Sequence, residues 1–326
     1  MLGAAAESLL HDLGPPTGAR TRWVAGQLRA LATTCRVRAG ERLSWAEQVG
    51  RCLQVTPTLG DREAYAVAHA ALEGLLPGPG PLAERFAAHR TATAVPPDEL
   101  PRALAAVVGL LRERVATLLP AGEALELQVV AAAPWSALCR AAGPLRSVVA
   151  VSAARPLPAA ALVALAAHET YPGHHVERCL LAGRPERQVV VVATPEAVVT
   201  EGLGQTALRA SGLTVADCGP LLGRDLTHAD AVARAAAPLA RTKADAALLL
   251  RTRGARAAHR HLTRWGLHDP ARADVQLAFL QDPRWVVHAA AYGAGADLVG
   301  AWLDAGRPYA DLLGRPVTPD DLRVGA

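Results

Sequence analysis

The sequence predicts a mainly α-helical array with a small β-sheet beside its central helix. Hydrophobic residues make up 51% of the 326 positions, alanine supplies much of that share, and aromatic residues reach only 4%. Alanine has the highest intrinsic helix propensity, so this composition favours helices that pack closely through small side chains. Apolar residues recur with helical spacing through most of the chain, whereas runs rich in β-branched residues are few and short.

Residues 1–119 are predicted to form an N-terminal helical region. Ser44-Trp45-Ala46-Glu47 is a capping-box pattern, in which the hydroxyl and the carboxylate each accept from a backbone N–H at a helix start. The segment Pro77-Gly78-Pro79-Gly80-Pro81 predicts a stiff, non-helical connector. From Asp98 to Leu118 the apolar spacing is again helical.

Residues 120–326 are predicted to form a second region, which either is a separate catalytic domain or continues the first one. Runs of β-branched residues predict three strands, at Leu125–Ala131, Ser147–Ser152 and Gln188–Val192. Helices are expected over Pro156–Ala167, from Thr194-Pro195-Glu196 onward, and through most of the chain after Thr227. Thr194 is a favourable N-cap, and Pro195 suits the first helical position.

Several classes of function are disfavoured by composition. The formal net charge is +4, and the arginines are scattered instead of gathered in a basic run, so we expect no nucleic-acid partner. No stretch approaches the ~20 apolar residues of a membrane span, and the N-terminus lacks a signal-peptide pattern, so a cytoplasmic location is expected. The five cysteines are widely spaced and form no CxxC pair, which is typical of reduced thiols.

The segment His168-Glu169-Thr170-Tyr171-Pro172-Gly173-His174-His175 concentrates potential metal ligands in eight positions. It is not the HExxH motif, because Pro172 occupies the place of the second histidine. In an unbroken helix His175 would share a face with His168 but lie about 10.5 Å along the axis from it, which is a strain for two ligands of one ion. Pro-Gly can bend the backbone, and such a bend favours His174 as the second ligand, with His175 the next candidate.

Glu201 is the candidate for a third ligand. It lies seven positions into the helix predicted from Thr194, next to Gly202 and Gly204, which permit another helix to approach closely. The apolar run before it indicates a largely buried helix, in which an unpaired carboxylate would be costly unless a cation lay nearby.

HETYPGHH followed by ATPEAVVTEG resembles a large bacterial family of unknown function with an HExxPGHH signature and a downstream EG motif. The similarity extends roughly from Gln128 to Ala301. The shorter matching pieces are Pro134-Trp135-Ser136-Ala137, Arg146-Ser147, Asp245-Ala246-Ala247-Leu248, Asp282-Pro283-Arg284-Trp285 and Tyr292-Gly293. Members look like zinc peptidases of the gluzincin type, so the resemblance implies a zincin-like helical array with one Zn²⁺. It also implies that His168, one or both of His174 and His175, and Glu201 are ligands and that Glu169 is the catalytic base.

This chain departs from many members of that family in two respects. An aromatic residue commonly follows the glutamate and glycine of the EG motif, whereas Leu203 stands here, and the N-terminal region is short. Both departures bear on the size of the substrate cleft.

A zinc-dependent hydrolase would act on an amide bond in a small peptide or an N-acyl amino acid. Tyr292 is the first candidate to donate to the oxyanion, and His288, one helical turn earlier, is the second. Arg146 and Arg284 are candidates to bind a substrate carboxylate. The predicted Ser147–Ser152 strand could pair with an extended peptide if it lay at a sheet edge.

Two other functions remain open. Two histidines and one carboxylate also form the metal site of non-haem iron enzymes, although that function would leave Glu169 without a role. The chain could alternatively be a non-catalytic helical binding protein that retains a vestigial metal site.

Overall fold

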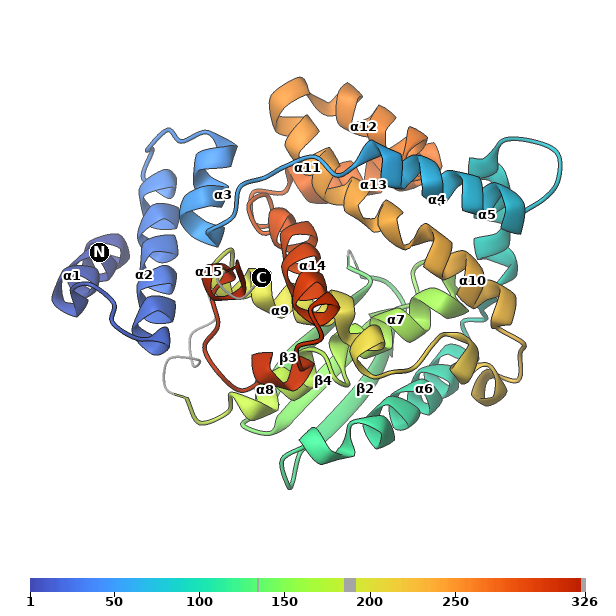
Figure 1. Ribbon diagram of the computed structural model, residues 1–326, viewed down its shortest axis with the longest axis horizontal. Helices are drawn as coiled ribbons and strands as arrows, with labels where there is room; N and C mark the ends of the chain where they lie inside the picture. Colours follow the sequence, from blue (N-terminus) through green and yellow to red (C-terminus); the bar gives the residue numbers. More distant parts are fainter. Residues whose placement is uncertain (134, 185–191, 324–326) are drawn as a thin grey trace.

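The computed structural model describes residues 1–133, 135–184 and 192–323. It is mainly helical and contains two small sheets, as the composition predicts (Figure 1). The predicted strand at Gln188–Val192 falls almost entirely outside the described residues. In the described part of the chain, no helix is long and apolar enough to cross a membrane.

The helices before the main sheet are α1 (Leu2–Leu13), α2 (Ala19–Arg38), α3 (Trp45–Leu53), α4 (Arg62–Leu75), α5 (Leu82–Ala92) and α6 (Leu100–Arg114). After it follow α7 (Ala159–Glu169), α8 (His174–Leu180), α9 (Pro195–Ala210), α10 (Thr227–Ala236), α11 (Thr242–Arg253), α12 (Ala255–Arg264), α13 (Pro270–Gln281), α14 (Ala289–Asp304) and α15 (Pro319–Arg323). The strands are β1 (Ala94–Val95), β2 (Ala124–Val130), β3 (Ala137–Gly143), β4 (Arg146–Ser152) and β5 (Leu157–Pro158).

Local signals place several of these elements correctly. Ser44 caps α3 and forms the predicted capping box with Glu47. The Pro77–Pro81 segment is the loop between α4 and α5, and Thr194 is the N-cap of α9 with Pro195 at its first position, although the Thr194 side chain makes no capping bond. The predicted helix at Pro156–Ala167 begins later, at Ala159, because Leu157 and Pro158 pair with β1.

The main sheet has the strand order β2-β4-β3, with β2 parallel and β3 antiparallel to β4. Two of its strands correspond to the predicted ones, whereas β3 was not predicted, because its alanine-rich sequence lacks β-branched residues. The Ser147–Ser152 segment lies in β4, the central strand, so its suggested role as an edge for peptide pairing is wrong. Both sides of β4 are already hydrogen-bonded to neighbouring strands.

Two large hydrophobic clusters meet at α9. The first joins the sheet to α6, α7, α8 and α9, and the second joins α9 to α2, α3, α11, α12, α13 and α14. In Figure 1 the sheet and α6 lie at the bottom of the view, and α11 to α13 lie at the top. Residues before and after position 119 belong to both clusters, so hydrophobic packing continues across that position. The division into two regions stays a prediction.

The closest helix packing in this core joins α9 to α14. A Cβ placed on Gly202 would lie 2.4 Å from the carbonyl oxygen of Gly295, and one on Gly295 would lie 2.2 Å from that of Val198. These two glycines therefore allow the two backbones to touch. The contact positions Glu201, which immediately precedes Gly202.

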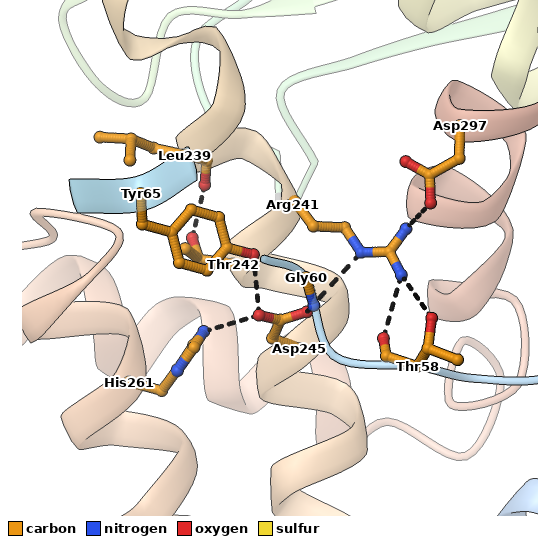
Figure 2. Close-up of polar contacts among 9 residues, drawn as sticks. All are labelled: Thr58, Gly60, Tyr65, Leu239, Arg241, Thr242, Asp245, His261 and Asp297. Atoms are coloured by element: carbon orange, nitrogen blue, oxygen red, sulfur yellow. Dashed lines mark hydrogen bonds and ion pairs between the residues drawn. The ribbon is translucent and has the colours of Figure 1, made fainter. Parts of the chain in front are cut away.

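A buried polar network ties the N-terminal region to the second cluster (Figure 2). The Asp245 carboxylate accepts hydrogen bonds from the Gly60 N–H and the Tyr65 hydroxyl, each at 2.8 Å, and lies 3.0 Å from Nε2 of His261. Burial opposes the ionisation of Asp245, but the contacts from His261, Gly60 and Tyr65 outweigh it and lower the pKa of this carboxyl. Arg241 completes the network by reaching Asp245, Asp297 and Thr58.

Replacing Asp245 with alanine is expected to reduce the free energy of unfolding by about 3–5 kcal/mol, because Gly60, Tyr65 and His261 lose the buried carboxylate that they contact. Chemical denaturation measures this loss. The matched control is Asp297→Ala, which removes an aspartate that is 63% exposed and also pairs with Arg241. The control should lose less than about 1 kcal/mol. Equal losses in the two variants would contradict the conclusion that the buried carboxylate of Asp245 contributes more stability than the exposed one of Asp297.

Candidate metal centre

The His168–His175 segment turns sharply at Pro172. Helix α7 ends at Glu169, and α8 begins at His174. The Thr170 N–H donates to the Ala166 carbonyl at 2.9 Å, and the Gly173 N–H reaches back six residues to the Ala167 carbonyl at 3.1 Å. The Tyr171–Pro172 peptide bond is cis. The chain therefore ends one helix and starts another, where the sequence suggested a kink or bulge.

This turn brings the first two candidate ligands together. The rings of His168 and His174 lie edge to face, with their centroids 4.5 Å apart. Glu201 approaches from α9, and one potential ligand atom from each of the three residues lies within 4.8 Å of the others. An ion with bonds of ~2.0–2.2 Å can bind such a group after small side-chain adjustments. The prediction that a bend at Pro172-Gly173 makes His168, His174 and Glu201 converge is confirmed.

The state of the Glu201 carboxylate supports a cation at this position. One of its oxygens, Oε2, is buried without a hydrogen-bond partner and lies 3.5 Å from Nε2 of His168. Burial opposes its ionisation, but the nearby imidazoles of His168 and His288 lower its pKa, so the group is a carboxylate. An orphaned buried carboxylate oxygen is costly, and a bound metal ion would satisfy it. The donor set therefore fits a metal.

The two histidines differ in their electrostatic environments. Burial, followed by the neighbouring charge of His168, lowers the pKa of His174 to about 3, so this ring is neutral, as a metal ligand must be. Burial also acts to lower the pKa of His168, but its contact with Glu201 reverses the direction and raises it. Because a metal ion binds only the neutral imidazole, metal binding at this centre would compete with protonation of His168.

The imidazole of His168 lies directly against α9. A Cβ on Gly204 would lie 2.5–2.8 Å from three atoms of the His168 ring. Glycine at position 204 therefore makes room for a ligand side chain, while Gly202 makes room for α14. The sequence indicated that these glycines permit close approach but not what approaches each of them.

His288 lies behind the cluster, at the N-terminus of α14. Its Nε2 is 3.1 Å from Oε1 of Glu201, the oxygen that is not orphaned, and its ring meets that of Tyr292 edge-on at 5.4 Å. Through this contact His288 can hold the carboxylate of Glu201 in its orientation. The role that the sequence suggested for His288, as a donor to a substrate oxyanion, stays a prediction. Partners of this kind hold metal ligands in place and tune their basicity.

Tyr292 and Glu169 flank the same centre. Burial, followed by the charges of Glu201 and Glu169, raises the pKa of Tyr292 well above its usual range, so the hydroxyl keeps its proton. Glu169 is buried at the end of α7. Burial raises its pKa, while nearby His168 and a hydrogen bond from the Cys139 N–H act in the opposite direction.

His175 does not join the cluster. It is fully buried and faces away from His174, with Nε2 2.7 Å from Oε2 of Glu123 and Nδ1 2.9 Å from Oγ of Ser147. Because both ring nitrogens have other partners, the suggestion that His175 is a ligand is not supported by this geometry. Adjacent residues on a helix point about 100° apart, so only one of the pair can face the centre.

Neither arginine proposed for substrate binding is brought to the cluster by a contact among residues 1–133, 135–184 and 192–323. The Arg284 side chain is 74% exposed and forms an ion pair with Asp282. Arg146 is exposed at the first position of β4. The role of these two arginines in substrate binding stays a prediction.

The sequence did not indicate the roles of three residues near the centre. Glu123 and Ser147 are the partners of His175, and the backbone of Cys139 influences the pKa of Glu169. Glu123 follows a glycine just before β2, in a segment without any recognisable motif. The contact between Glu123 and His175 depends on the pairing of β2 with β4, which no local sequence pattern predicts.

Fold and site together define a mainly helical protein with a buried cluster of two histidines and one glutamate that could hold a metal ion. Comparisons with protein-family models, with curated proteins and with solved structures give no match.

Proposed function

We propose that this protein is a zinc-dependent hydrolase that cleaves an amide bond in a small peptide or an N-acyl amino acid. The observation that carries the proposal is the convergence of His168, His174 and Glu201 in a buried site. Glu169, the residue after His168, is buried and interacts electrostatically with His168 and Glu201. Three protein ligands are typical of catalytic zinc sites, because they leave one coordination position open, whereas structural sites use four.

When bound, zinc supplies Lewis acidity, which polarises a carbonyl group and makes water more acidic. Glu169 is the general base in this proposal, since it adjoins His168 in sequence and interacts electrostatically with both His168 and Glu201. It takes a proton from the attacking water and delivers it to the leaving amine nitrogen. The backbone of Cys139, in β3, acts against the burial that raises the pKa of Glu169.

Tyr292 is the proposed donor to the carbonyl oxygen of the substrate as negative charge develops there. Its hydroxyl keeps its proton near the carboxylates of Glu201 and Glu169, and a protonated phenol is the form that can donate. His288 has a different role, because it holds Glu201 in its orientation through the 3.1 Å contact. The resemblance to the HExxPGHH family supports the same division of roles for His168, Glu169 and Glu201.

A ferrous site is the alternative that the same ligand set permits, since two histidines and one carboxylate also bind non-haem iron. The buried carboxylate of Glu169 favours hydrolysis, because an oxygenase would have no use for a base at this position. Metal analysis of protein purified without added metal separates the two. Iron with oxygen-dependent turnover would support the alternative, and bound metal without turnover of either kind would support a non-catalytic protein.

The decisive experiment compares wild type with Glu169→Gln on a panel of peptides and N-acyl amino acids. The substitution is expected to lower kcat by about 10²–10⁴-fold, the usual contribution of a general base. Zinc content should stay at one equivalent, because Glu169 is outside the ligand group. Glu126→Gln, which alters an exposed carboxylate on β2, is the control and should retain activity. Loss of zinc from Glu169→Gln would instead identify Glu169 as a ligand.

A further inference from the structure

The carboxylate of Glu123 organises a second buried cluster on the far side of the Pro172 turn. Its side chain is only 2% exposed. Oε2 accepts from Nε2 of His175 at 2.7 Å and from the Tyr171 hydroxyl at 2.9 Å, and Oε1 accepts from Nε of Arg112 at 2.7 Å. Burial opposes the ionisation of Glu123, but these three donors outweigh it and lower its pKa.

These contacts determine both the tautomer and the orientation of the His175 ring. A carboxylate can only accept, so Nε2 of His175 carries the hydrogen, and Nδ1 of the neutral ring accepts from the Ser147 hydroxyl at 2.9 Å. Burial lowers the pKa of His175 by more than the contact with Glu123 raises it, in agreement with a neutral ring. The ring is therefore held between the loop before β2 and the central strand β4.

The two donors Tyr171 and His175 lie on either side of Pro172-Gly173. One carboxylate therefore holds both ends of the turn that returns the chain toward His168. The tether is needed because α8 has only seven residues, and a helix of that length has little stability of its own. His174, in the first turn of α8, can face the metal centre only while its neighbour His175 faces Glu123.

We propose that Glu123 is a positioning residue of the metal centre: by holding Tyr171 and His175, it directs His174 toward His168 and Glu201 and so sets the affinity for metal. The inference rests on the proposed function, because it requires that metal binds at these three residues. It goes beyond that function by assigning control of metal affinity to a residue that does not contact the ligand group.

The test is the zinc dissociation constant of the full-length protein, measured by competition with a chromophoric chelator. Glu123→Gln keeps the size of the side chain but loses its charge and part of its accepting capacity. We expect its zinc affinity to fall by about 10–100-fold, as for other residues that orient ligands indirectly. Melting of the metal-free proteins is recorded alongside, to separate lost stability from lost affinity.

Arg112→Ala is the matched control. Arg112 is 55% exposed and binds the other oxygen of the same carboxylate, so its removal leaves the contacts to Tyr171 and His175 in place. Its zinc affinity should stay within about twofold of wild type, because the exposed guanidinium of Arg112 is screened by solvent and salt and binds Oε1 of Glu123, whereas Tyr171 and His175 bind Oε2. Should Glu123→Gln fail to fold, Tyr171→Phe removes a single hydrogen bond to Glu123 and should weaken zinc binding by a smaller factor.

A second readout does not depend on metal. In the metal-free protein, the amides of residues 170–176 should exchange with solvent faster in Glu123→Gln than in Arg112→Ala, since only the first variant releases the turn. Lower stability with unchanged zinc affinity and unchanged exchange would show that Glu123 is only structural and would overturn the inference. Weakened zinc binding in a protein that hydrolyses none of the substrates would leave the inference intact while refuting the hydrolase.

Discussion

Glu201→Ala is expected to lose tightly bound zinc almost entirely. The substitution removes the only carboxylate of the candidate ligand group and deprives His288 of its acceptor. Because residues that merely orient ligands cost 10–100-fold in affinity, the loss of a ligand should exceed about 100-fold. Metal content after dialysis, measured by elemental analysis, reports the result, and circular dichroism verifies that the helical content is retained.

The control for this experiment is Glu113→Ala, which removes an exposed carboxylate on α6. It should retain one equivalent of zinc. If Glu201→Ala also retained one equivalent, the assignment of Glu201 as a ligand would be wrong, and the proposed function would lose the observation that carries it.

Gly295→Ala is expected to destabilise the protein by about 3 kcal/mol or more. A Cβ at this position would lie 2.2 Å from the Val198 carbonyl oxygen and 2.6 Å from the Gly202 nitrogen. Overpacking usually costs 1–3 kcal/mol, and this case belongs at the upper end because backbone atoms cannot move aside by rotating a side chain. Thermal and chemical denaturation measure the loss. Zinc affinity should fall as well, because α9 carries Glu201 beside the contact.

Gly300→Ala is a close control, because Gly300 lies on the same helix, α14, with nothing within 4 Å of an added Cβ. This substitution should stabilise the protein by about 0.5–1 kcal/mol, since alanine is the better helix former. Similar effects of the two substitutions would contradict the close contact between α9 and α14.

The residues that lead to the metal centre could be predicted because their signals are local. The backbone nitrogen of Pro172 has no hydrogen to donate, so a regular helix cannot continue from His168 through His174, and this follows from covalent structure alone. Thr194-Pro195 likewise predicts where α9 starts and therefore the approximate position of Glu201 on it. Such features depend on neighbours in sequence, and for them the structure confirmed the prediction.

Three outcomes could not be predicted, because each depends on which segments meet in space. His175 was a possible ligand until the pairing of β2 with β4 brought Glu123 and Ser147 to its two nitrogens. The contact of His288 with Glu201 arises only because α14 packs against α9, and the sequence, which suggested His288 only as a donor to an oxyanion, did not indicate it.

The third such outcome is the place of β4 in the sheet, since a run of β-branched residues favours a strand but does not reveal its neighbours. The amino-acid sequence by itself therefore determined which side chains of this protein are able to bind a metal and where the backbone must turn. Tertiary packing alone decided which of those side chains face one another, because hydrogen bonds and close contacts between distant segments select one orientation for each ring and carboxylate.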